Sequence, residues 1–273
     1  MTEERFIDIK RLVKSKSPKL AKWIPGFVYN YLKRILHQDE MNAFIRENKT
    51  FQNADFCRVI INYFQINIEI IGKENIPQNG PIVIAMNHPL GGMDAIALIA
   101  ELQDHRTDLK FVVNDLLMNL TQLKDLFVGV NKYGKNEGST RQQIANLFDS
   151  ETAVCIFPAG LVSRKIDGEI VDLDWKKTFV TYADKNGQAI IPIHITGGLS
   201  NFFYRLSRFR KALGIKMNIE MLYLSDEMFR QKGKTIRFTV GKPFYVKDLP
   251  AVSEREKAQI VKRMVYDLKK QVN

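Results

Sequence analysis

The chain has 273 residues, which allows one large domain or two small ones, and 45% of its residues are hydrophobic, as in ordinary soluble globular proteins. No uninterrupted apolar run approaches the length that a membrane-spanning helix needs. The formal net charge of +11 indicates an anionic partner, which could be a phospholipid surface, a phosphorylated or carrier-linked substrate, or nucleic acid.

Residues 1–65 are predicted to be helical. Apolar side chains recur at intervals of three and four residues over 20–36, and lysines and arginines lie outside that stripe. Pro25-Gly26 is expected to kink this helix or divide it in two. Such a basic amphipathic segment can lie in the plane of a membrane or pack on the rest of the protein, and both interpretations stay open.

From residue 66 onward, strand patterns alternate with helix patterns. Strands are predicted at 66–70, 81–86, 111–113, 127–130, 152–157, 189–195, 216–224 and 235–240, and helices at 94–102, 139–148, 175–185 and 254–271. This alternation predicts an α/β fold with a single central mixed, largely parallel sheet flanked by helices. We therefore divide the chain into an N-terminal helical, basic amphipathic extension, 1–65, and an α/β domain, 66–273.

The most informative segment runs from residue 82 to residue 94. A short apolar strand leads to His88, and a turn through Gly91-Gly92 returns Asp94 toward the imidazole where a helix begins. A histidine polarised by a carboxylate can remove a proton from a hydroxyl near neutral pH. No serine or cysteine stands beside the pair, so the substrate itself is expected to carry the nucleophile. By the simpler interpretations, Asp94 is a helix N-cap and His88 a structural histidine bonded to a carbonyl.

Three motifs carry a resemblance to a known family. Asn87-His88 with Asp94, then Phe157-Pro158-Ala159-Gly160, then Ile191-Pro192-Ile193, resemble in order the motif series of the glycerolipid (lysophospholipid) acyltransferases, which include 1-acylglycerol-3-phosphate acyltransferases. Five residues separate His88 from Asp94, where the family usually has four, and Ala159 stands where the family usually has glutamate. The continuation with Ser163 and Arg164 looks like a hemolysin-related branch that includes acyltransferases of amino-acid-linked lipids.

The resemblance implies that His88 and Asp94 are the catalytic pair. It also places substrate binding around ten residues: Asn87, Gly91, Gly92, Lys132, Phe157, Pro158, Ala159, Gly160, Ser163 and Arg164. Lys132 is the nearest cationic match to the family's arginine-containing second block. Arg164 is either a bidentate partner for a phosphate or carboxylate headgroup or a solvated surface arginine. Gly91-Gly92 gives the loop freedom to absorb the additional residue.

The function implied is O-acyl transfer from an acyl carrier protein or coenzyme A thioester to the hydroxyl of a lysolipid. The predicted mechanism is general-base catalysis by His88 and Asp94 without an acyl-enzyme. Lysophosphatidic acid is the family's usual acceptor, and a mono-acylated amino-acid lipid is its rival. The alternative function is a non-catalytic membrane lipid-binding protein on the same fold.

Expected partners are a membrane surface with anionic lipids, the thioester donor and the lysolipid acceptor. Residues 200–216 combine five basic residues with several aromatic ones and no acidic residue, which suits a membrane interface. No nucleic-acid-binding motif accompanies this segment, so nucleic acid is not an expected partner. The predicted location is cytoplasmic, peripheral on the inner face of the cell membrane.

No metal ion and no bound cofactor are expected. The histidines, cysteines and acidic residues lack metal-ligand spacing, and neither Gly91-Gly92 nor Gly197-Gly198 stands in a nucleotide-binding motif. Cys57 and Cys155 lie in apolar segments and are interpreted as buried thiols of a reducing compartment. The charged first residues lack the apolar core of a signal peptide, so export is not expected.

Overall fold

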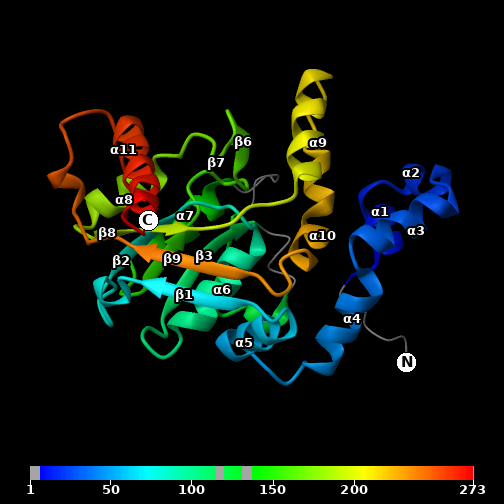
Figure 1. Ribbon diagram of the computed structural model, residues 1–273, viewed down its shortest axis with the longest axis horizontal. Coiled ribbons are helices and arrows are strands. Elements are labelled where there is room, and N and C mark those ends of the chain that lie inside the picture. Colours follow the sequence, from blue (N-terminus) through cyan, green and yellow to red (C-terminus); the bar gives the residue numbers. More distant parts are fainter. Residues whose placement is uncertain (1–6, 115–119, 131–136, 273) are drawn as a thin grey trace. The chain divides into compact units, whose positions relative to one another are not determined.

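Figure 1 shows the computed structural model, which describes residues 7–114, 120–130 and 137–272. The chain forms two compact units. Of the described residues, 52–114, 120–130, 137–198 and 233–272 make up the sheet unit, and 7–51 and 199–232 make up the helical unit. Residues 52–65, which the sequence analysis assigned to the N-terminal extension, group here with the sheet.

The described part of the sheet unit contains a seven-stranded sheet. Its strands, in spatial order, are β1 (Asn67–Ile71), β9 (Thr235–Val240), β8 (Ala189–Ile195), β2 (Ile82–Met86), β5 (Ala153–Ile156), β3 (Leu109–Asn114) and β4 (Phe127–Val130). All neighbouring strands are parallel except β8 and β9, which are antiparallel. The predicted fold class, a mixed and largely parallel sheet, is confirmed. A separate antiparallel hairpin, β6 (Arg164–Ile166) and β7 (Glu169–Val171), was not predicted.

Strand β2 lies near the middle of the sheet, between β5 and β8. Ala85 pairs with Ile156 of β5 and with Pro192 of β8, so the three strands end at the same edge. Every residue of β2 is buried, which explains its uninterrupted apolar sequence. The sheet thereby brings the ends of two sequence motifs, at His88 and Phe157, to neighbouring positions.

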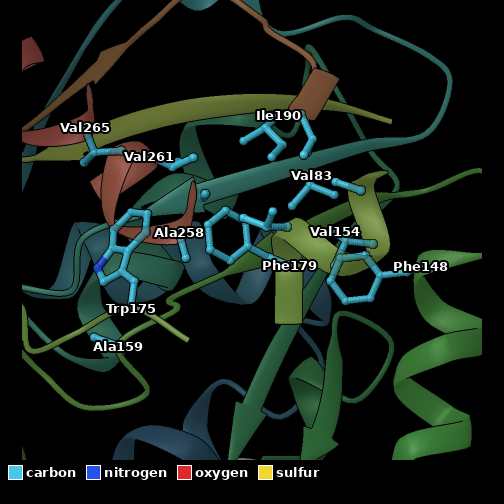
Figure 2. Close-up of a cluster of buried hydrophobic side chains, with 14 of the residues drawn as sticks. Val83, Phe148, Val154, Ala159, Trp175, Phe179, Ile190, Ala258, Val261 and Val265 are labelled. Carbon is cyan, nitrogen blue, oxygen red and sulfur yellow. The ribbon is translucent and has the colours of Figure 1, made fainter. Parts of the chain in front are cut away.

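Helices cover both faces of this sheet. On one face, α7 (Glu137–Phe148), α8 (Thr178–Lys185) and α11 (Glu254–Asp267) contribute to a buried apolar cluster with β2, β5 and β8 (Figure 2). Its members include Val83, Phe148, Val154, Trp175, Phe179, Ile190, Ala258, Val261 and Val265. On the opposite face, α5 (Asn53–Tyr63) packs against α6 (Gly92–Leu102) (Figure 1).

The helical unit combines two distant parts of the chain. Its helices are α1 (Ile9–Lys16), α2 (Pro18–Trp23), α3 (Gly26–Ile35), α4 (Gln38–Glu47), α9 (Asn201–Ala212) and α10 (Leu224–Phe229). His37 connects the two parts, because its ring stacks on Phe229 at a centroid distance of 3.8 Å and bonds Asp226 at 3.2 Å. As predicted, Pro25-Gly26 separates two helices. Within the described residues, no helix has both the length and the apolar character to cross a membrane.

The strand predicted at 216–224 is wrong. A 3₁₀ helix, Ile219–Tyr223, lies there and leads into α10. The apolar and polar residues alternate as in a strand, but Glu220 is fully buried and pairs with Arg210 of α9 at 2.8 Å. A buried ion pair of this kind depends on a distant partner, which a local pattern does not reveal.

Candidate active site

Asn87 fastens the end of β2 to the end of β8. Its amide nitrogen donates to the Ile195 carbonyl at 2.9 Å, and its amide oxygen accepts from the Ile195 N–H at 2.7 Å. The residue is buried, and these two bonds use both ends of its amide. Asn87, predicted to bind substrate, therefore acts in this structure as a clamp that fixes where the next residue begins.

His88 and Asp94 are in direct contact. The His88 Nδ1 lies 2.9 Å from the Asp94 Oδ2, which also accepts the Leu90 N–H at 3.0 Å. Asp94 is fully buried in the first turn of α6, where the helix dipole favours a negative charge. Since an ionised carboxylate only accepts hydrogen bonds, Nδ1 carries the proton and Nε2 presents its lone pair.

The turn from His88 to Asp94 contains five residues, and Gly91 gives it the conformation that brings the two side chains together. This glycine adopts φ 69° and ψ −137°, a conformation that side chains strongly disfavour, and its carbonyl accepts the Asp94 N–H at 3.0 Å. A second glycine supports the same loop from outside. A Cβ on Gly197, whose φ is +117°, would lie 2.9 Å from the Leu90 side chain. A separation of five residues thus still gives a hydrogen-bonded pair.

Burial raises the pKa of the Asp94 carboxyl above its ordinary value of 3.8. The hydrogen bond and charge interaction with His88 and the Leu90 N–H oppose this rise in the pKa, while the nearby Asp172 carboxylate adds to it. The ionised form of Asp94 therefore costs the folded protein stability.

A mainly apolar pocket of about 250 Å³ opens beside His88. The imidazole forms part of its wall and stacks on Phe157 at a centroid distance of 4.1 Å. Most of the apolar side chains that line the pocket come from β3, β5, α7 and the segment after β5: Val112, Val113, Ile144, Phe148, Ile156, Phe157 and Pro158. Ala95 of α6 completes the apolar lining. A pocket of this composition suits a hydrocarbon chain.

The predicted binding residues divide between the pocket and the core. Gly91, Gly92, Phe157, Pro158 and Gly160 line the pocket. Gly160, at φ 66°, closes the turn after β5 by donating its N–H to the Phe157 carbonyl at 2.9 Å.

Ala159 instead belongs to the buried cluster that contains Trp175 (Figure 2). Ser163 is fully buried and donates its hydroxyl to Asp172 at 2.6 Å. Arg164 is 4% exposed and donates to the Val162 carbonyl at 2.6 Å, so the solvated-surface interpretation of Arg164 is wrong. Lys132 lies outside the described residues.

Sequence reasoning missed two residues of this region. Asp172 is a buried carboxylate that contacts the main chain of His88, and Lys176 lines the pocket. No local signal marks Asp172, because Glu169 and Asp174 stand close to it in the sequence and are acidic as well. Among the described residues, no group of three or more histidine, cysteine or acidic side chains could hold a metal ion.

Comparison with known proteins agrees with this geometry. The family model described as "Acyltransferase" matches residues 11–273. A protein of Phocaeicola vulgatus named lyso-glycine lipid O-acyltransferase is 43% identical over 272 residues, covering 98% of both chains. A protein of the same name from Bacteroides thetaiotaomicron is 42% identical over 276 residues, covering 98% of this chain and all of that one. The chain belongs to the acyltransferase family.

The family predicted from the motif series is thereby confirmed, and the protein is an acyltransferase enzyme. Among solved structures, the 1-acyl-sn-glycerophosphate acyltransferase PlsC from Thermotoga maritima is similar, with a TM-score of 0.49, 20% identity and 89% coverage of each chain.

Replacing Asp94 by asparagine should separate stability from activity in this acyltransferase. Because burial raises the folded-state pKa, the parent loses stability as pH rises from 3.8 through the folded pKa, whereas an asparagine amide cannot ionise. At pH 7 Asp94→Asn should therefore unfold at a higher urea concentration than the parent, with a smaller difference at pH 4. Its turnover should fall by about 10²- to 10⁴-fold, because the imidazole loses its anionic partner. A variant that is less stable than the parent at pH 7 would contradict this account of Asp94.

Proposed function

We propose that this acyltransferase transfers a fatty acyl group from an acyl carrier protein or coenzyme A thioester to the hydroxyl of a lyso-glycine lipid. The observation that carries the proposal is the hydrogen-bonded His88–Asp94 pair at the wall of an apolar pocket. The names of two relatives that match nearly the whole chain support the acceptor class. Since glycine has no hydroxyl, the acceptor hydroxyl lies on the fatty chain of the mono-acylated lipid, and an N-linked glycine keeps its carboxylate.

In this mechanism His88 is the general base. Its Nε2 takes the proton of the acceptor hydroxyl while the oxygen attacks the thioester carbonyl. The tetrahedral intermediate then collapses, the C–S bond breaks, and the imidazolium returns the proton to the leaving thiolate. Asp94 holds the ring and stabilises the imidazolium. One ester forms, one thioester is consumed, and the proton passes from hydroxyl to thiol.

The surroundings of the pair favour direct transfer over an acyl-enzyme. Ser163 is fully buried, and its hydroxyl is donated to Asp172. Burial raises the pKa of the Cys57 thiol to about 12 and raises that of Cys155 further above its ordinary value. A thiol in such surroundings is a poor nucleophile. The attacking oxygen is therefore assigned to the substrate.

The proposed anion contact is Lys176. Of the described residues that line the pocket, it alone carries a permanent positive charge. Its N–H donates to the Pro158 carbonyl at 3.1 Å, and the preceding Trp175 is buried, which fixes its position at the pocket. The neighbouring Lys177 points elsewhere, since its amine donates to Glu254 at 2.6 Å. A glycine carboxylate or a donor phosphate would suit Lys176 as a partner.

The decisive assay supplies acyl carrier protein and coenzyme A thioesters with detergent-dispersed acceptors. A mono-acylated hydroxy-fatty glycine is compared with lysophosphatidic acid. The parent should acylate the glycine lipid, and His88→Ala should lose about 10²- to 10⁴-fold of this activity because the base is gone. Transfer to lysophosphatidic acid alone would contradict the proposal that a lyso-glycine lipid is the acceptor. Full activity of folded His88→Ala would contradict the proposal that His88 is the general base.

The same assay tests Lys176 against its matched control. Lys176→Ala should raise KM by about tenfold, since a charge-assisted bond to an anion is lost. Lys177→Ala, which removes an equal charge one residue away, should leave KM near the parent value. An equal rise in KM for both variants would show that the net positive charge of this region, and not a contact with Lys176, lowers the KM.

The proposed location is a membrane surface that contacts the helical unit. Trp23 and Phe27 are 84% and 73% exposed, and Lys33 and Arg34 follow in α3. On α9, Phe203, Tyr204, Ser207 and Arg210 are buried, while the exposed side combines two aromatic residues with basic ones, namely Phe202, Arg205, Arg208, Phe209 and Lys211. Aromatic and basic side chains together favour the interface of an anionic bilayer.

Vesicle sedimentation tests this surface. The protein should bind phosphatidylglycerol-containing vesicles better than pure phosphatidylcholine vesicles, because basic residues add attraction to anionic lipid. The double variant Phe202→Ser/Phe209→Ser should bind several-fold more weakly, whereas Val252→Ser, which removes an exposed apolar group from the sheet unit, should bind as the parent does. Unchanged binding by the double variant would exclude α9 from the interface.

A further inference from the structure

His88 lies beyond the part of the chain that the sheet holds in place. The last paired residue of β2 is Met86, opposite Ile193, and the side chain of Asn87 continues the connection to β8. No strand pairing reaches the main chain of His88 among the described residues. Its position therefore depends on other contacts.

The segment after β5 supplies those contacts. The Asp172 Oδ1 accepts the His88 N–H at 3.2 Å, and the Ser163 N–H donates to the His88 carbonyl at 2.8 Å. Ser163 and Asp172 are also bonded to each other, hydroxyl to carboxylate, at 2.6 Å. The N–H and the carbonyl of His88 are thus both bonded to the Ser163–Asp172 pair.

Every polar atom of Asp172 has a hydrogen-bond partner. Its side chain is 1% exposed, and its second oxygen accepts the Trp175 indole N–H at 2.8 Å. Its own N–H donates to the Tyr266 hydroxyl, and its carbonyl accepts the Lys262 amine, both at 2.7 Å. Three donors keep the buried carboxylate hydrogen-bonded, as burial of a charge requires. Through Tyr266 and Lys262, α11 fixes the main chain of Asp172.

We propose that Asp172 is a positioning residue for catalysis, which holds the main chain of His88 so that its imidazole meets Asp94 on one side and substrate on the other. This rests on the proposed role of His88. Asp94, bonded at Nδ1, and Phe157, stacked on the ring face, then fix the orientation of the imidazole. Asp172 and Ser163 fix the main chain of His88. Loss of the carboxylate leaves the partly buried His88 N–H without its acceptor and frees the residue to move. A displacement of about 1 Å costs roughly 10²-fold in rate.

A purely structural role for Asp172, as the partner of Trp175, makes different predictions. In Asp172→Asn the side-chain oxygen can still accept from His88 and Ser163, but its amide N–H₂ then faces the Trp175 N–H, donor against donor. Trp175→Phe removes the opposing donor. A positioning role therefore predicts that Asp172→Asn lowers kcat and that the second substitution restores it. A purely structural role predicts that these substitutions change the melting temperature and leave the kcat of the folded protein near that of the parent.

The experiment measures kcat, KM and melting temperature with the mono-acylated hydroxy-fatty glycine and an acyl-coenzyme A. Asp172→Ala should lower kcat by about 10- to 100-fold, with KM within about twofold of the parent. The kcat of Asp172→Asn should lie between that of Asp172→Ala and that of the parent. Asp172→Asn/Trp175→Phe should recover most of the kcat of Trp175→Phe, and Asp172→Ala/Trp175→Phe should not. Val261→Ala, a cluster residue of α11 without a bond to Asp172, should lower the melting temperature but not kcat.

Two results would overturn the inference. One is a kcat of Asp172→Ala equal to that of the parent, and the other is a folded Asp172→Asn/Trp175→Phe variant no more active than Asp172→Asn. If Asp172→Ala fails to fold, the rescue comparison still decides. His88→Ala, measured alongside, separates this failure from failure of the proposed function, because full activity there rejects the general base whatever Asp172 does.

Discussion

The site depends on the parallel, in-register pairing of β2 with β5. Because Ala85 lies opposite Ile156, the two strands end together, and the residues that follow them, His88 and Phe157, come within stacking distance. Residues far apart in the sequence thus form one wall of a pocket. The carboxyl edge of a parallel sheet is where α/β proteins commonly place ligands, since the loops there are free to carry polar groups. The sheet brings the two strand ends together, and contacts outside the sheet then fix the main chain and ring of His88.

Buried polar groups fix the position of His88, and burying such a group costs stability unless it has a hydrogen-bond partner. Asn87 is bonded at both ends of its amide, and the carboxylate of Asp172 has three donors. Asp94 is the exception, because burial raises its pKa and its Oδ1 has no hydrogen-bond partner among the described residues. Stability is thereby given up at the residue that would polarise His88 in the proposed mechanism, which is where an enzyme gains from an ionised but poorly solvated group.

The sequence predicts the fold and the contact between His88 and Asp94 well, because both have local signals. Apolar runs mark the central strands, and Gly91-Gly92 marks the turn that joins His88 to Asp94. What it does not predict depends on partners far along the chain. Ser163 and Arg164 are buried, Glu220 turns inward to Arg210, and Asp172 gains its importance from contacts with His88 and α11. No periodicity or motif in one sequence reveals such pairings.

Direct transfer between two bound substrates is the central chemical claim, and intact-mass spectrometry tests it most directly. The protein is incubated with an acyl-coenzyme A in the absence of acceptor, quenched in acid within the time of one turnover, and weighed. Direct transfer predicts the unmodified mass, because no exposed and activated serine or cysteine accompanies His88 in the described pocket. One acyl group per chain, lost on addition of the lysolipid, would establish an acyl-enzyme and contradict it.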